Sequence, residues 1–241
     1  MLTSGNLKIY TRLPCPDVDF FNGLTFPEAF LPEAMSSADV RPHSQLAECA
    51  ILLTLCGRIL SLGHAGPPDI AYSTTASDLF VRHDWLDSMV SRRLDHLRAN
   101  HPATAATTLD SMTIFLYMIA HSATVVLCNS VEALPRNEQN QALVWRFQER
   151  GLWAAQEIAR LAKEHQHAGL FKAHTFTPLA IYLSATRLGH HLEIHKEELD
   201  ARAVKGIEAS RRMAHQSLQK LSSVNRLADH YLRMLDLIEC L

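Results

Sequence analysis

Residues 78–128 constrain the fold most, because they predict two long helices in direct succession. In the first, apolar positions and one histidine recur at steps of three and four, which is the spacing of one helix face. Pro102 prevents this helix from continuing past His101, and Asp78 or one of residues 73–77 can cap its start. The positions that share the face are Leu79, His83, Leu86, Val90, Leu94 and Leu97.

The second helix of the pair is apolar on two opposite sides, and Asp110 is its expected N-cap. A helix of this kind is usually buried between neighbours, so we expect the remaining helices to pack around it. One stripe consists of Met112, Phe115, Ile119, Ala123 and Val126, and the other of Ile114, Met118, His121, Val125 and Cys128.

The same pair carries a resemblance to a known family. Residues 82–97 read RH-x-x-LD and S-x-RLD-x-L, and residues 110–124 read DSM-x-x-FL-x-x-IAH-x-AT. This pattern resembles the regulatory domain of fungal-specific transcription factors, the "middle homology region" found beside binuclear zinc-cluster DNA-binding domains. The residues that match are Arg82, His83, Leu86, Asp87, Arg93, Leu94, Leu97, Ala120, His121, Ala123 and Thr124.

Three further segments of the chain fit the same family in the right order, so the resemblance covers roughly residues 10–190. It implies a helical domain that modulates activity by binding a small metabolite or a partner protein, and it implies a nuclear location. The segments are RLPCPDVDFFNG at 12–23, AAQEIARL at 154–161 and FKAHTFTPLAIYLSA at 171–185.

We therefore expect an all-α chain that folds as one bundle-like domain of about seven helices. Residues 1–40, where prolines interrupt the aromatic residues, form a loop-rich strap, and residues 41–241 form the helical domain. The 9 Gly and 10 Pro of the 241 residues lie between the periodic segments, unlike the frequent turns of a sheet protein.

Periodicity predicts five helices besides the central pair. Gly151 lies on the apolar face of the third of the long helices, where it allows another helix to come close, and Gly169 ends that helix. Thr177 and Pro178 form a start signal, with Thr177 as the cap and proline as the first helical residue. The predicted helices span 43–62, 138–168, 178 to about 193, 196–221, and the residues after Asn225.

Charge and apolar runs limit the possible partners. The net charge of −2 and a pI of about 6.7 are unlike the basic footprint of a nucleic-acid binder, so we expect no direct contact with nucleic acid. The longest apolar run, 114–128, is shorter than the roughly twenty residues of a membrane span, and the N-terminus has no signal peptide pattern. We expect a soluble intracellular protein whose 5 scattered cysteines are free thiols.

Metal sites are not indicated by the cysteines or by the 14 histidines. A binuclear zinc cluster needs two closely spaced cysteine triplets, and the sequence contains no C-x-x-C pair. His191 and His195 are one helical turn apart with His190 beside them, but no third ligand is evident, so a solvated helix end is the favoured interpretation. We expect no metal and no cofactor.

A pocket lined by histidines is the one candidate site. His83, His121 and His174 lie in the family-like segments, where they either face an interior cavity or bond to backbone carbonyls in the core, and the second interpretation is favoured. The candidate ligand-binding residues are Arg58, His83, Tyr117, His121 and His174, and none is assigned a catalytic role.

Three functions are considered, and the first is the one that we favour. The first is a transcription-factor-like regulatory domain without its own DNA-binding module, which acts through a small-molecule effector or a partner protein, either a full-length transcription factor or a second copy. The chain has no Lys/Arg-rich nuclear localisation segment. The second is an enzyme or ligand-binding protein of secondary metabolism recruited from this fold, which a large enclosed histidine-lined pocket would favour. The third is a gene fragment with no independent role.

Overall fold

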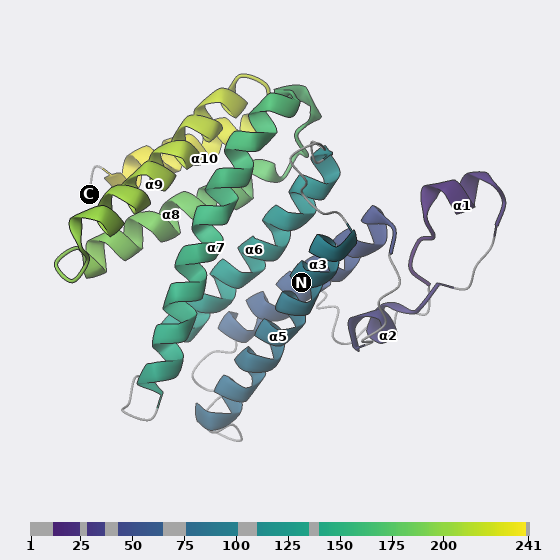
Figure 1. The fold of residues 1–241 in the computed structure, drawn as a ribbon, viewed down its shortest axis with the longest axis horizontal. Coiled ribbons are helices and arrows are strands. Elements are labelled where there is room, and N and C mark those ends of the chain that lie inside the picture. Colours follow the sequence, from purple (N-terminus) through teal and green to yellow (C-terminus); the bar gives the residue numbers. More distant parts are fainter. Residues whose placement is uncertain are drawn as a thin grey trace. The chain divides into compact units, whose positions relative to one another are not determined.

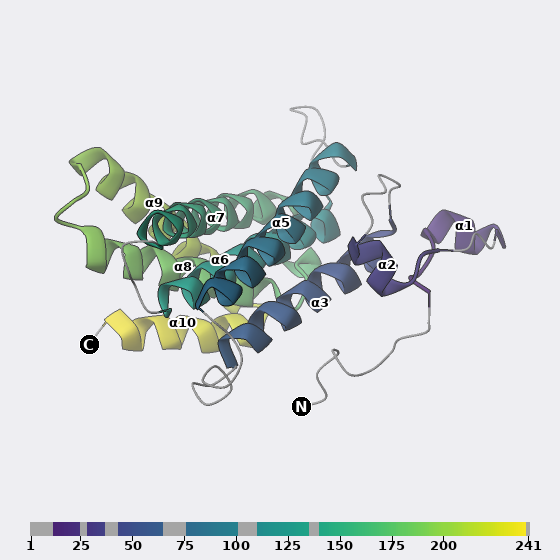
Figure 2. The same cartoon turned by 90° about the horizontal axis from the view of Figure 1, so that it is seen from below.

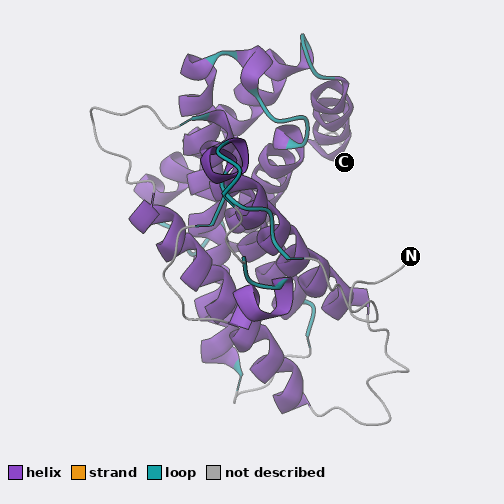
Figure 3. Cartoon of the chain, turned by 90° about the vertical axis from the view of Figure 1, so that its right-hand side faces the viewer, coloured by secondary structure: helices purple, strands orange, loops and turns teal. Residues whose placement is uncertain are grey.

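In the computed structural model, the described residues are 12–24, 28–36, 43–64, 76–100, 110–134 and 140–239. They form nine α-helices and one 3-10 turn and contain no β-strand, only an isolated bridge between Arg12 and Phe30 (Figure 3). The predicted all-α fold class is confirmed. Seven of the helices have 14 residues or more, in agreement with the expected number.

The chain divides into two compact units, Met1–Thr104 and Ala105–Leu241. The predicted strap falls in the first unit, and its described part holds two short helices, α1 (Asp17–Phe21) and α2 (Leu31–Ser36), which the proline pattern did not predict. The Ser44 hydroxyl donates a hydrogen bond to the Pro14 carbonyl at 2.9 Å and so ties the strap to the next helix. The predicted domain boundary at residue 40 lies outside the described residues.

The first unit is built on α3 (Gln45–His64) and α5 (Ala76–Asn100), which pack against each other. The predicted face of α5 is confirmed, because all six of its positions are buried. One side of α3 is buried, and its other side is exposed. Its buried aliphatic residues are Ile51, Leu52, Leu55 and Ile59.

The second unit is organised around α6 (Ser111–Glu132), in which 16 of 22 residues are buried. Asp110 caps it as predicted, since its carboxylate accepts hydrogen bonds from the backbone N–H groups of Met112 and Thr113 at 2.9 and 3.0 Å. Both predicted stripes are buried apart from Met112 and Val126, which are half-buried. α6 is therefore the interior helix of this unit, as its two apolar sides predict.

α7 (Gln141–Ala168) runs along α6 and also packs against α8 and α9 (Figure 1). At Gly151 a Cβ atom would lie 2.9 Å from Cys128 Cβ on α6, so the predicted close approach is confirmed. Gly169 ends the helix with a φ of 102°, a left-handed conformation that glycine adopts without strain.

The 3-10 turn η1 (Leu170–Lys172) leads to α8 (Thr177–His195), α9 (Ala201–Ser222) and α10 (Arg226–Glu239). α9 packs along α8, and α10 packs against both (Figure 2). Thr177 is the first helical residue and Phe176 occupies the cap position, so the predicted cap was wrong by one residue. α9 begins five residues later than predicted because Asp200 accepts a hydrogen bond from Ala203 N at 2.6 Å and caps the helix there.

Two helices among the described residues are long and apolar enough to cross a membrane by length and composition. The windows are Gln45–Leu62 in α3 and Ser111–Glu132 in α6, so the apolar segment of α6 is longer than the run that the sequence suggested. The window in α6 is 83% buried, as expected for the core helix of a folded unit, whereas the window in α3 is only 39% buried.

Candidate functional site

The five predicted ligand-binding residues lie on several elements of the two units. Arg58 is exposed on α3, and His83 is buried on α5. Tyr117 and His121 are buried on α6, and His174 follows η1. Neither of the two hollows found in the described part of the second unit is lined by any of them. Their role in binding a ligand remains a prediction.

Each of the three histidines has a packing contact of its own. His83 Nδ1 lies 2.7 Å from the Leu79 carbonyl oxygen, and burial lowers the pKa of His83 although this hydrogen bond raises it. His121 meets the edge of Trp153 with ring centroids 5.1 Å apart. His174 stacks on Phe115 at 3.7 Å, and burial lowers its pKa too. His83 and His121 are buried, whereas His174 is half-buried.

A buried charge cluster in the first unit joins α2, α3 and α5. Glu48 Oε1 lies 3.0 Å from His96 Nδ1 and 3.5 Å from Arg93 Nη1, and Arg93 also donates to the Ala34 carbonyl oxygen. Burial raises the pKa of Glu48 more than the Arg93 charge lowers it. Arg93 is one of the residues that carry the family resemblance, and here it links three helices.

A second buried ion pair lies inside the second unit, and the sequence offered no signal for it. The Arg187 guanidinium on α8 donates to both carboxylate oxygens of Glu132 at 2.6 and 2.7 Å. It also donates to Asn129 Oδ1 at 3.2 Å and to the Gln148 carbonyl oxygen at 3.3 Å. The pair fastens α8 to α6 and α7.

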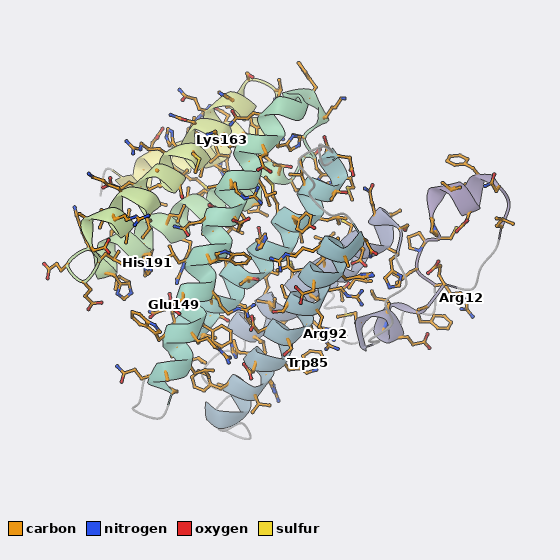
Figure 4. The ribbon with its side chains drawn as sticks, viewed as in Figure 1. Arg12, Trp85, Arg92, Glu149, Lys163 and His191 are labelled. Atoms are coloured by element: carbon orange, nitrogen blue, oxygen red, sulfur yellow. The ribbon has the colours of Figure 1, made fainter. Side chains whose placement is uncertain are left out.

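The pair of histidines near the end of α8 is close enough to interact. The rings of His191 and His195 are 4.7 Å apart between centroids, and His195 also contacts Glu198 and Trp145. His191 is labelled in Figure 4. Burial, together with the neighbouring His195 and Arg187 charges, lowers the pKa of His191 to about 4. Among the described residues, no three side chains of His, Cys, Asp or Glu gather as metal ligands.

The exposed side of α3 carries leucines at intervals of seven residues, which we call the leucine stripe. Leu46, Leu53 and Leu60 are 62%, 54% and 49% exposed. Ala50 and Gly57 lie four residues after the first two leucines on the same side, and a Cβ built at Gly57 would have no atom within 4 Å. The stripe is therefore an open apolar surface with two small residues in it.

Comparison with known proteins shows that the chain is similar to fungal transcription factors of secondary-metabolite biosynthesis. It is 31% identical over 239 residues to a pigment biosynthesis transcriptional activator of Monascus ruber, a match that covers 99% of this chain. It is 34% identical over 186 residues to a citrinin biosynthesis transcriptional activator of Monascus purpureus, which covers 76% of this chain. A sorbicillinoid biosynthetic cluster transcription factor of Hypocrea jecorina is 28% identical over 95% of this chain.

The matches cover most of the length of this chain but less than half of the length of each relative. The chain spans 41% of the length of the pigment activator, 32% of the citrinin activator and 34% of the sorbicillinoid factor. No family model matches the chain. No solved structure matches it.

Proposed function

Because the homologues of this chain are transcription factors of fungal secondary-metabolite gene clusters, we propose that it is a regulatory domain of that kind which acts by pairing with a partner chain. The observation that carries the proposal is the homology, which runs through 99% of the chain and through only 41% of the pigment activator. The sequence of this chain contains neither of the two cysteine triplets that a binuclear zinc cluster needs. The domain thus modulates transcription instead of reading DNA, and we infer that it works in the nucleus.

The leucine stripe is the surface that we propose for pairing, and its occupant is α3 of a second copy. Leucines that recur every seven residues form the seam of a coiled coil, in which side chains of one helix fill the gaps of the other. The stripe extends over 14 residue steps, which is roughly 21 Å of helix at 1.5 Å per residue. Such a seam stabilises pairing only if another apolar helix covers it.

The stripe suits its own copy for two reasons. A two-fold axis through the middle of α3 brings Leu53 against Leu53 of the second copy and Leu46 against its Leu60, so the same patch serves both chains. No charged residue lies among the five residues of the stripe and its small positions, so the two surfaces do not repel. Ala50 and Gly57 allow the two helix backbones to come close.

Sedimentation equilibrium of the purified full chain tests the pairing. We expect a concentration-dependent dimer. Leu53→Gln should raise the dissociation constant of this dimer about tenfold, because glutamine places an amide in the apolar seam. Leu237→Gln on α10 is the matched control, since Leu237 is 68% exposed and belongs to the second unit. A monomer at every concentration, or an equal loss in both variants, contradicts pairing through α3.

A reporter assay tests the regulatory role independently. The chain, fused to an unrelated DNA-binding domain, should change transcription of a reporter relative to that DNA-binding domain alone. Expression at the level of the DNA-binding domain alone, with the fusion present in the nucleus at the same abundance, contradicts a regulatory role.

A further inference from the structure

Two adjacent hollows lie in the second unit around the start of α10, the end of α9 and η1. The outer hollow has a volume of about 390 Å³, and the inner one of about 10 Å³, enough for a single polar atom or water. Ala173 and Leu221 line both hollows, so the inner one is a recess beside the outer one. The outer volume is in the range of small-molecule sites.

Two residues that line the inner recess each carry a buried polar atom without a hydrogen-bond partner among the described residues. The two atoms are His165 Nε2 on α7 and Thr177 Oγ1 at the start of α8, and the two residues are only 4% and 1% exposed. The Ser217 hydroxyl beside them is engaged, because it donates to the Met213 carbonyl oxygen and accepts from Gln166 Nε2, both at 2.7 Å. Buried polar groups are nearly always satisfied, so the recess is suited to a polar atom from outside the chain.

The outer hollow combines an apolar wall with a positive rim. Phe171, Leu221 and Leu227 supply apolar surface, and Phe171 is 89% exposed although it lies beside these residues. Arg226 on the wall is exposed at the first position of α10, where the helix dipole adds positive potential, and the acidic residue of this first turn, Asp229, is paired with Arg233. Among the described residues that line the two hollows, none is acidic.

We propose that this end of the second unit binds a small cyclic carboxylate that has a hydroxyl or carbonyl group opposite the carboxylate. Its apolar body lies against Phe171, Leu221 and Leu227, and its carboxylate accepts from Arg226. The opposite polar group enters the recess and bonds to His165 Nε2 and Thr177 Oγ1. The proposal deepens the proposed function, since such a ligand would be the effector of the regulatory domain, but binding is measured without any transcription assay.

The charge of the ligand is tested on the full chain with two probes of one shape, 2-naphthoate and its neutral amide 2-naphthamide. We expect saturable binding of both by titration calorimetry or chemical-shift changes. Arg226→Gln should weaken binding of the naphthoate about tenfold and leave the amide unchanged, because only the carboxylate makes a charge-assisted hydrogen bond. Arg202→Gln, an exposed arginine at the start of α9 and so at the opposite end of that helix from the hollows, is the control and should change neither.

The recess is tested by adding a hydroxyl to the probe. We expect 6-hydroxy-2-naphthoate to bind at least about threefold more tightly than 2-naphthoate, and we expect Thr177→Val to abolish this difference, since valine has the shape of threonine without the hydroxyl. Circular dichroism shows whether the variant keeps its fold. Absence of saturation, an equal effect of Arg226→Gln and Arg202→Gln, or a hydroxyl gain that survives in Thr177→Val each overturns the proposal.

Discussion

The environment of Arg187 is the one that could least be predicted from the sequence. Arg187 lies on α8 between Thr186 and Leu188, it is 3% exposed, and its partner Glu132 is 55 positions away in the chain. A pattern of apolar spacing locates a buried face but does not say which charge meets a buried arginine. The desolvation of the two charges is offset here by a bidentate hydrogen bond and by acceptors from Asn129 and Gln148.

The Arg187–Glu132 pair makes stability depend on pH. Burial raises the pKa of Glu132, but the hydrogen bonds and charge of Arg187 outweigh burial, so its folded pKa is below the ordinary 4.5. A carboxyl group with a lowered folded pKa contributes stability above its unfolded pKa, and this contribution is lost as pH falls through the folded pKa. We expect Glu132→Gln to cost about 2–4 kcal/mol at neutral pH and less in acid, measured by urea unfolding from about pH 6 to about pH 3.

Glu197→Gln is the control for that measurement, because Glu197 is exposed after α8 and should leave the pH profile as it is. A variant Glu132→Gln whose free energy of unfolding falls with acid as steeply as that of the original chain would show that Glu132 is not the group responsible.

Helix positions were largely predictable, and the errors have physical causes. The long apolar periodicities and Asp110 located α5, α6 and α7 to within a few residues. The start of α9 was missed because the residues before Asp200 are compatible with a helix, and only the cap decides where it begins. α1 and α2 were missed because each is shorter than two turns, too short for a periodic pattern to be read.

Gly151 sets the distance between α6 and α7, so a methyl group there tests how tightly these helices pack. The new Cβ would lie 2.9 Å from Cys128 Cβ and 3.3 Å from Arg187 Nε. We expect Gly151→Ala to lower the free energy of unfolding by about 1–3 kcal/mol, because overpacking exceeds the helix propensity that alanine adds. Chemical unfolding monitored by circular dichroism provides the measurement.

Gly206→Ala on α9 is the matched control. A Cβ at Gly206 would have no atom within 4 Å, so alanine should stabilise the chain by about 0.5–1 kcal/mol. If Gly151→Ala were equally stabilising, the close contact with Cys128 would not be a feature of the protein in solution.

The second unit contains its own core, and this predicts that it folds alone. α7, α8 and α9 contact one another, α6 contacts α7 and α8, and α10 closes against α8 and α9. We expect a chain of residues 105–241 to be helical by circular dichroism and to unfold in one cooperative thermal transition. A broad transition together with strong binding of a hydrophobic dye would be the behaviour of a molten globule and would contradict this expectation.

The predicted and the proposed sites differ because they depend on different information. The histidine hypothesis used residue types near family-like motifs, and the structure places His83 in the first unit and His121 and His174 in the second. The hollows at Arg226 are formed by η1, the end of α9 and the start of α10, together with α7 and α8 in the recess. No local pattern in the sequence indicates that these segments meet.

The burial of α6 has a consequence for synthesis of the protein. The ribosome completes this helix before α7 and α8, which cover it, have been made. At roughly 5–20 residues per second, its apolar surface stays uncovered for several seconds of translation. A nascent chain in this state exposes a long apolar segment to chaperones and to other nascent chains. The yield of native protein therefore depends on how fast the rest of the unit is synthesised.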